Sequence, residues 1–122
     1  MDQDLASVQE ARDLLARASK AQQAFAHATQ EQVDRVVTAM AQAASAAAER
    51  LARLAVDETG MGRYQDKIVK NRFAADDVLK YILPLKTVGV IREYPERKVK
   101  ELAVPMGVVA ALVPPPNPPS TA

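Results

Sequence analysis

The sequence contains no cysteine, no tryptophan and a single histidine, and aromatic residues make up only 4% of it. Without cysteine, the chain can form no disulfide, no thiolate metal site and no cysteine nucleophile. His27 alone cannot hold a zinc ion, so no metal site is predicted. No apolar run reaches the roughly 18 residues that a membrane-spanning helix needs, and the N-terminus lacks the pattern of a secretory signal. We therefore expect a cytoplasmic chain.

Excess charge of one sign is also missing, because 16 lysines and arginines face 15 aspartates and glutamates, which gives a net charge of +1. A near-neutral chain has no strong field to attract nucleic acid or an anionic membrane, so neither is predicted as a partner. What is abundant is alanine, with 23 residues, of which 17 lie in residues 1–55. Alanine favours helices but buries little area, so a thin core is expected.

Proline divides the chain into two parts. It is absent from residues 1–83, and all eight prolines lie at or after Pro84. Since proline interrupts helices, the first part can be helical and the second cannot. Apolar spacing predicts helices over about 4–26, 29–57 and 64–83. The second is expected to be continuous, about 40 Å long, and to end at Gly60.

The second part is rich in β-forming residues. Residues 84–105 favour a hairpin with its turn at Pro95-Glu96-Arg97. The segment Val108–Val113 has no polar residue, which is typical of a strand buried on both faces of a parallel α/β sheet. Such a strand needs neighbouring strands and covering helices, and the nine residues after it supply neither. The pattern favours the front end of a larger protein, with a small α+β domain as the alternative.

Five prolines crowd around Asn117 in residues 114–119. From the residues alone, two interpretations stay open. One is a polyproline tail that acts as a spacer or as a ligand for aromatic grooves. The other is a ligand-binding loop, because α/β proteins bind ligands beyond the carboxyl ends of buried parallel strands. In such a loop, a rigidly held Asn117 can donate a hydrogen bond to a developing oxyanion.

Three motifs, in the same order, resemble those of the CoA-acylating aldehyde dehydrogenases. Residues 57–71, DETGMGRYQDKIVKN, are similar to the family signature E-T-G-x-G-x-x-x-D-K-x-x-K-N. Residues 86–91, KTVGVI, resemble its K-T-V-G-x-I strand. Residues 105–122 resemble its P-x-G-V-x-A…V/I-P-x-x-N-P-x-S-T-A pattern. The resemblance covers nearly the whole chain and is weakest over residues 1–25.

This resemblance implies an α/β protein that corresponds to the N-terminal portion of the aldehyde dehydrogenase fold. Residues 1–83 would be its long N-terminal helices, 84–105 an oligomerisation-type β-hairpin, and 106–122 the first buried strand and active-site loop of an incomplete dinucleotide-binding domain. The implied full-length enzyme is a cytoplasmic, bacterial-type oxidoreductase and a homo-oligomer. It oxidises a small aldehyde with NAD or NADP, through a cysteine thiohemiacetal, and passes the acyl group to coenzyme A.

The resemblance also assigns roles to individual residues. Asn117 would stabilise the oxyanion, and the NAD or NADP cofactor would lie beside Val113, Pro114, Pro115 and Pro116. The chain departs from the family pattern at Pro115, Pro116 and Pro119, where the family has threonines or similar small residues, and each proline removes a backbone donor. These residues do not select the aldehyde or the choice between NAD and NADP.

The absence of cysteine predicts that the 122 residues alone are inactive, since the nucleophile is missing. Two non-enzymatic alternatives remain open at this point. One is a short helical and hairpin module that pairs with a full-length relative, and the other is a helical scaffold that presents a proline-rich tail. An amphipathic N-terminal helix can also serve to package an enzyme in a bacterial microcompartment, although such helices more often pack on their own domain.

Overall fold

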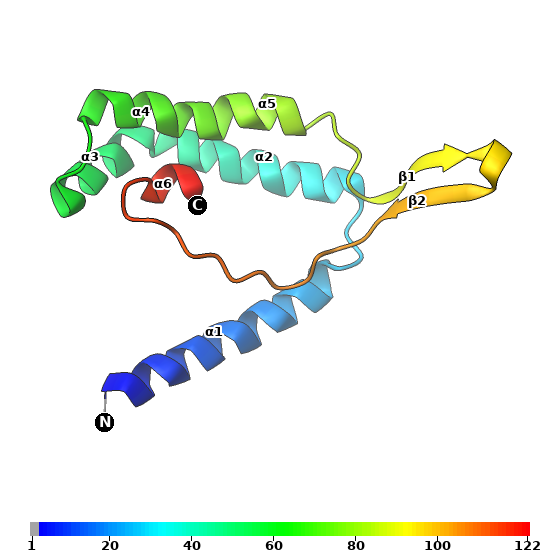
Figure 1. Cartoon of the computed structure of the whole chain (residues 1–122), viewed down its shortest axis with the longest axis horizontal. Coiled ribbons are helices and arrows are strands. Elements are labelled where there is room, and N and C mark those ends of the chain that lie inside the picture. Colours follow the sequence, from blue (N-terminus) through cyan, green and yellow to red (C-terminus); the bar gives the residue numbers. More distant parts are fainter. Residues whose placement is uncertain (1–2) are drawn as a thin grey trace. The chain divides into compact units, whose positions relative to one another are not determined.

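A computed structural model describes residues 3–122, and Figure 1 shows its helices and its one hairpin. The chain divides into two compact units. One unit combines Met1–Thr29 with Thr87–Ala110, and the other combines Gln30–Lys86 with Ala111–Ala122. Among the residues described, no helix is long and apolar enough to cross a membrane.

The first unit contains the N-terminal helix and the hairpin. Helix α1 spans Gln3–Phe25, and strands β1 (Gly89–Tyr94) and β2 (Val99–Ala103) pair antiparallel. A 3₁₀ turn over Pro95–Arg97 joins the strands, as the proline at its start predicts. Lys98 completes the turn in the left-handed conformation, with φ of 53°. The first predicted helix and the hairpin are therefore confirmed.

The register of the hairpin is held by side chains on one face. Gly89 lies opposite Ala103 and Tyr94 opposite Val99, with an irregularity between Val90 and Arg92. The Tyr94 hydroxyl accepts a hydrogen bond from Arg92 Nη1 at 3.0 Å and donates one to a Glu101 carboxylate oxygen at 2.9 Å. Cross-strand pairs of this kind stabilise a two-stranded sheet that has no third strand to support it.

The second unit is built from two interrupted helices, which lie side by side in Figure 1. The first comprises α2 (Gln30–Ala46) and α3 (Ala48–Thr59), separated at Ala47. Our expectation of one continuous helix over 29–57 is therefore wrong. Good helix formers flank the break on both sides, so sequence gives no warning of it. Just after the break, the carbonyl of Ala48 accepts a hydrogen bond from the buried side chain of Asn71.

The second interrupted helix confirms the element predicted over 64–83. It comprises α4 (Tyr64–Arg72), a π-helical turn over Phe73–Asp77 and α5 (Val78–Ile82). A π turn inserts extra backbone into an α-helix without ending it, and such turns are frequent at functional sites.

Alanine forms most of the core of the second unit, as the composition predicts. Ala48 and Ala52 are fully buried on α3, and Ala55 lies one turn further along. Because these side chains are a single methyl group, α3 approaches α4 closely. The core buries little apolar area per residue, so each position tolerates little added volume.

The strand predicted over Val108–Val113 does not form within residues 3–122. The one sheet of the described chain is the β1–β2 pair, and residues 104–113 have no strand structure. Leu112 is 99% exposed. The physical reason is that a strand exists through main-chain hydrogen bonds to a neighbour, and this segment makes none here. The predicted boundaries at 83 and 105 stay a prediction.

Candidate functional site

The proline-rich C-terminal loop packs against the helices of its unit. It ends in a short helix α6 (Pro118–Thr121), which contacts α3, α4 and the π turn. Asn117 lies at the start of α6, and its backbone N–H donates to the carbonyl of Pro114 at 3.2 Å, which closes a turn. The loop is therefore not an extended polyproline spacer, so that interpretation of its prolines is wrong.

Two lysines of α4 hold this loop. Lys67 Nζ donates to the backbone carbonyl of Pro116 at 3.0 Å, and Lys70 Nζ donates to Oδ1 of Asn117. Residues three apart lie on the same face of a helix, so both ammonium groups meet consecutive loop residues. Lys67 is only 5% exposed, and the polar cost of burying its ammonium is offset by the hydrogen bond to Pro116.

Glycines before α4 make room for this arrangement. Gly60 ends α3 in the left-handed conformation, with φ of 64°, and its N–H donates to the carbonyl of Val56 at 2.8 Å. This confirms the predicted helix stop. Gly62 has φ of 74°, and a Cβ there would lie 3.2 Å from Cε of Lys67. A side chain at Gly62 would therefore strain the backbone and crowd the lysine that holds the loop.

Arg63 and Asp66 form an ion pair at the start of α4. Arg63 Nε and Nη2 donate to the two Asp66 carboxylate oxygens at 2.8 and 3.1 Å. These bonds lower the pKa of Asp66 below its usual value. An acidic residue in the first turn also interacts favourably with the helix dipole. The carboxylate of Asp66 is thus paired with Arg63 and not with Lys67 or Lys70, which follow Asp66 on the same helix.

A shallow cleft of about 300 Å³ lies between the start of α4 and the loop. Asn117 is exposed at this cleft, and within residues 3–122 its Nδ2 has no hydrogen-bond partner. A lysine ammonium only donates hydrogen bonds, so the amide oxygen must face Lys70 and the amide nitrogen must face away from it. The cleft is lined by Met61, Gly62, Arg63, Asp66, Lys67, Lys70, Pro116 and Asn117.

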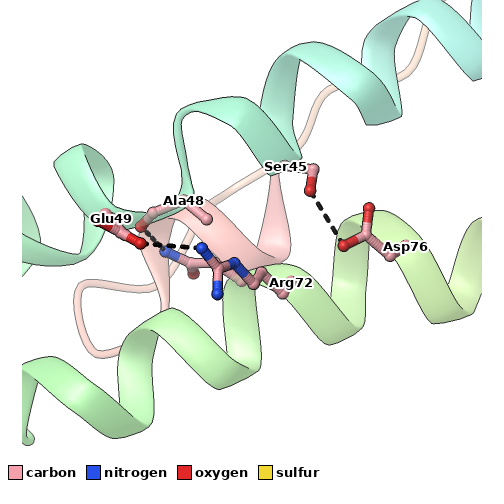
Figure 2. Close-up of polar contacts among 6 residues, drawn as sticks. Ser45, Ala48, Glu49, Arg72 and Asp76 are labelled. Atoms are coloured by element: carbon pink, nitrogen blue, oxygen red, sulfur yellow. Dashed lines mark hydrogen bonds and ion pairs between the residues drawn. The ribbon is translucent and has the colours of Figure 1, made fainter.

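Polar contacts also fix α4 and the π turn to the α2–α3 pair (Figure 2). Asn71 is buried, and its Nδ2 donates to the carbonyl of Ala48 at 3.0 Å. Arg72 pairs with Glu49 at 2.9 Å, and Ser45 donates to Asp76 of the π turn at 3.0 Å. The helix that carries the two lysines is therefore held against α2 and α3 by hydrogen bonds and an ion pair.

The structure brings together only some of the residues predicted for the site. All five are exposed; Pro116 and Asn117 accept hydrogen bonds from lysines of α4, whereas within residues 3–122 no hydrogen bond joins Val113, Pro114 or Pro115 to α4. Sequence reasoning missed Lys67 and Lys70, whose partners lie 49 and 47 residues away. The available signal was the D-K-x-x-K-N part of the signature, which places both lysines on one helical face.

Replacing Lys67 by methionine should loosen the loop, because the Pro116 carbonyl then loses its donor. A hydrogen bond from a charged group contributes about 1.5–3 kcal/mol, so hydrogen exchange at the Asn117 and Thr121 amides should become about 10- to 100-fold faster. The control is Lys80→Met, which removes an exposed lysine whose one ion pair within residues 3–122 is with Asp77 at 3.3 Å. Equal exchange rates in the two variants would contradict the anchoring role.

No family model matches the chain, but it is homologous to curated enzymes. It is 41% identical over 116 residues to the bifunctional aldehyde-alcohol dehydrogenase of Escherichia coli K12, a match that covers 95% of this chain and 13% of that protein. It is 41% identical over 107 residues to the acetylating succinate-semialdehyde dehydrogenase of Clostridium kluyveri, covering 88% of this chain and 24% of that enzyme. The chain thus spans less than a quarter of these relatives.

Solved structures agree with these matches. The chain superposes on a "probable aldehyde dehydrogenase" of Listeria monocytogenes with a TM-score of 0.96 and 50% identity, covering 99% of this chain and 27% of the other. The chain is therefore homologous to the N-terminal part of the aldehyde dehydrogenases.

Two of the similar proteins are acylating enzymes, which belong to one branch of that family. An acetylating aldehyde dehydrogenase of Geobacillus thermoglucosidasius superposes with a TM-score of 0.95 and 48% identity, covering 98% of this chain and 26% of that enzyme. With the acetylating relative from Clostridium, it confirms the family resemblance of the three motifs: the chain is related to the acylating aldehyde dehydrogenases.

Proposed function

We propose that these residues supply the N-terminal part of an NAD(P)-dependent acylating aldehyde dehydrogenase, and that the Asn117 loop lines its active site. Such an enzyme converts an aldehyde, coenzyme A and NAD or NADP into an acyl-CoA and the reduced cofactor. The observation that carries the proposal is the geometry of Asn117 at an open cleft: Lys70 holds its amide oxygen, while its Nδ2 has no hydrogen-bond partner among the residues that the structure describes. The similarity to acylating enzymes supports it.

Asn117 would act as an electrostatic stabiliser. When a nucleophile attacks an aldehyde carbonyl, negative charge develops on the oxygen, and a prepositioned N–H donor stabilises that charge by about 2.7–4 kcal/mol. The free Nδ2 group of Asn117 meets this requirement because its orientation is set before the reaction begins. The nucleophile must come from other residues, since none of these 122 is cysteine.

The loop can contribute to cofactor binding only in a limited way. Pro114, Pro115 and Pro116 have no backbone N–H, and the carbonyl of Pro116 already accepts a bond from Lys67. Proline rings and the carbonyls of Val113 and Pro115 remain available. These groups suit the flat face and the carboxamide of the cofactor's nicotinamide ring better than they suit the phosphates of the dinucleotide. The cofactor, when bound, would accept a hydride from the substrate.

The hairpin is proposed as a contact between subunits of the homo-oligomeric enzyme. Its two strands leave Ile91, Val99 and Leu102 exposed within their own unit, and a two-stranded sheet is marginally stable without further packing. Association through such a hairpin would cover these side chains. A cytoplasmic location, and packaging in a microcompartment through α1, stay predictions.

The proposal predicts activity in a chimera and none in the isolated chain. In the chimera, these residues replace the matching segment of the Geobacillus enzyme, to which they are 48% identical. We expect the chimera to form NADH from acetaldehyde, NAD and coenzyme A, as followed by absorbance, while the 122-residue chain gives no rate above a blank because it lacks the nucleophile. An inactive but correctly folded chimera, or turnover by the chain alone, would overturn the proposal.

A further inference from the structure

We propose that Lys70 is a positioning residue that sets the orientation of the Asn117 amide for oxyanion binding. The inference rests on the proposed function and deepens it, because it concerns how the same site is prepared for the reaction. Lys70 does not touch the substrate in this account. It acts on the amide oxygen, and through it on the amide nitrogen that faces the cleft.

The first step of the argument is the chemistry of the two side chains. A primary amide can turn by half a rotation and exchange its oxygen and nitrogen at almost no cost when nothing distinguishes the two ends. A lysine ammonium has three donors and no acceptor, so only the amide oxygen can face it. The contact from Lys70 to Asn117 Oδ1 therefore excludes the rotated amide, in which the acceptor oxygen would point toward a developing negative charge.

The second step concerns the strength of the donor. A cation that donates a hydrogen bond to the amide oxygen draws electron density away from the amide nitrogen. Linked hydrogen bonds strengthen one another in this way. The ammonium of Lys70 therefore makes the Nδ2–H of Asn117 a better donor to an anion. A neutral donor in place of Lys70 would orient the amide without the same polarisation.

The third step is that Lys70 is left available by its neighbours. An aspartate four residues before a lysine on a helix ordinarily forms an ion pair with it. Here Asp66 precedes Lys70 by four residues, but both carboxylate oxygens of Asp66 accept hydrogen bonds from Arg63, at 2.8 and 3.1 Å. No ion pair of Lys70 with an acidic residue is found in residues 3–122, and its hydrogen-bond partner there is the neutral amide.

The fourth step is the rigidity of the frame that carries Lys70. Lys67 fixes the backbone immediately before Asn117, through the carbonyl of Pro116. Asn71, which follows Lys70 on α4, fixes this helix to α3 through its hydrogen bond to the carbonyl of Ala48. With the loop backbone and the helix both held, the Lys70 bond controls the remaining side-chain torsions of Asn117. Lys67 thus fixes the loop backbone and Asn71 fixes the helix, whereas Lys70 sets the orientation of the Asn117 amide.

The test is a set of variants in the Geobacillus chimera. Lys70→Met should lower kcat about 10-fold while leaving KM for coenzyme A and the melting temperature nearly unchanged, because folding does not depend on this exposed contact. Lys70→Arg should restore most of the rate, since guanidinium is also a cationic donor. Lys80→Met, on α5 of the same interrupted helix, should have no effect, because within residues 3–122 Lys80 pairs only with the exposed Asp77.

A double-mutant comparison separates positioning from a general structural effect. If Lys70 acts through Asn117, then Lys70→Met should lower kcat no further in a chain that already carries Asn117→Ala. Full additivity of the two losses, or an unchanged kcat in Lys70→Met, would overturn the inference. An inactive parent chimera, or an Asn117→Ala variant with normal kcat, would instead overturn the proposed function, so the two failures are distinguishable.

Discussion

Asn117→Ala in the chimera should lower kcat about 100- to 1,000-fold, the loss measured when one oxyanion donor is removed from an enzyme. The substitution deletes the free Nδ2 donor and the acceptor of the Lys70 bond, while the Pro116 carbonyl stays bonded to Lys67. The loop backbone should therefore keep its place. Steady-state kinetics with acetaldehyde and coenzyme A measure the loss, and the melting temperature of the chimera should stay within a few degrees of the parent.

Asn117→Asp provides the sharper control, because aspartate has nearly the same shape. Its carboxylate can still accept a bond from Lys70, but it has no donor and places negative charge where an oxyanion would form. We expect a loss at least as large as that of the alanine variant. A near-normal kcat in Asn117→Asp would show that the side chain acts only by fixing the loop, and would contradict its role as a donor.

The second large effect is expected in the alanine core. Ala52 on α3 is fully buried where α3 contacts α4, so Ala52→Leu adds three methylene-sized groups to a space that holds one methyl. Overpacking of this kind costs about 1–3 kcal/mol, which is a large share of the stability of a domain of this size. Urea unfolding of the 122-residue chain, followed by circular dichroism, should show a lower midpoint.

The matched control for this core prediction is Ala46→Leu. Ala46 ends α2 and is exposed, so the same substitution adds no volume to the core and should change the unfolding free energy by less than about 0.5 kcal/mol. Similar midpoints for the two variants would show that α3 and α4 can move apart at little cost. That result would contradict the close packing that the buried alanines indicate.

Local sequence signals predicted those parts of the fold whose causes are local. The left-handed glycine that ends α3 and the proline-led hairpin turn need only their own residues, and both were predicted. Local signals did not predict the break at Ala47 or the absence of a strand over Val108–Val113. Good helix formers flank Ala47 on both sides, so no local residue marks the break, and a strand needs neighbouring strands that these residues do not supply.

The helix over 64–82 shows the same limit within one element. Apolar spacing predicted this helix, but its apolar Phe73 is 58% exposed and the polar side chains of Lys67 and Asn71 are buried. Periodicity weighs hydrophobicity alone, whereas these two residues are buried because each donates to a carbonyl on another segment. For the candidate site, the same reasoning found Asn117 from its position in the loop but not the lysines that hold it.

The π turn also determines the rotational phase of this helix. Lys67, Asn71, Ala75 and Leu79 recur every four residues, and the first three are buried while Leu79 is half-buried. At the 100° per residue of a regular α-helix, twelve residues would rotate Leu79 about 120° away from the direction of Lys67. The wider turn over Phe73–Asp77 takes up much of this excess, and α4, the π turn and α5 all stay in contact with α2. One extra residue in one turn thus keeps a four-residue repeat in step along the whole helix.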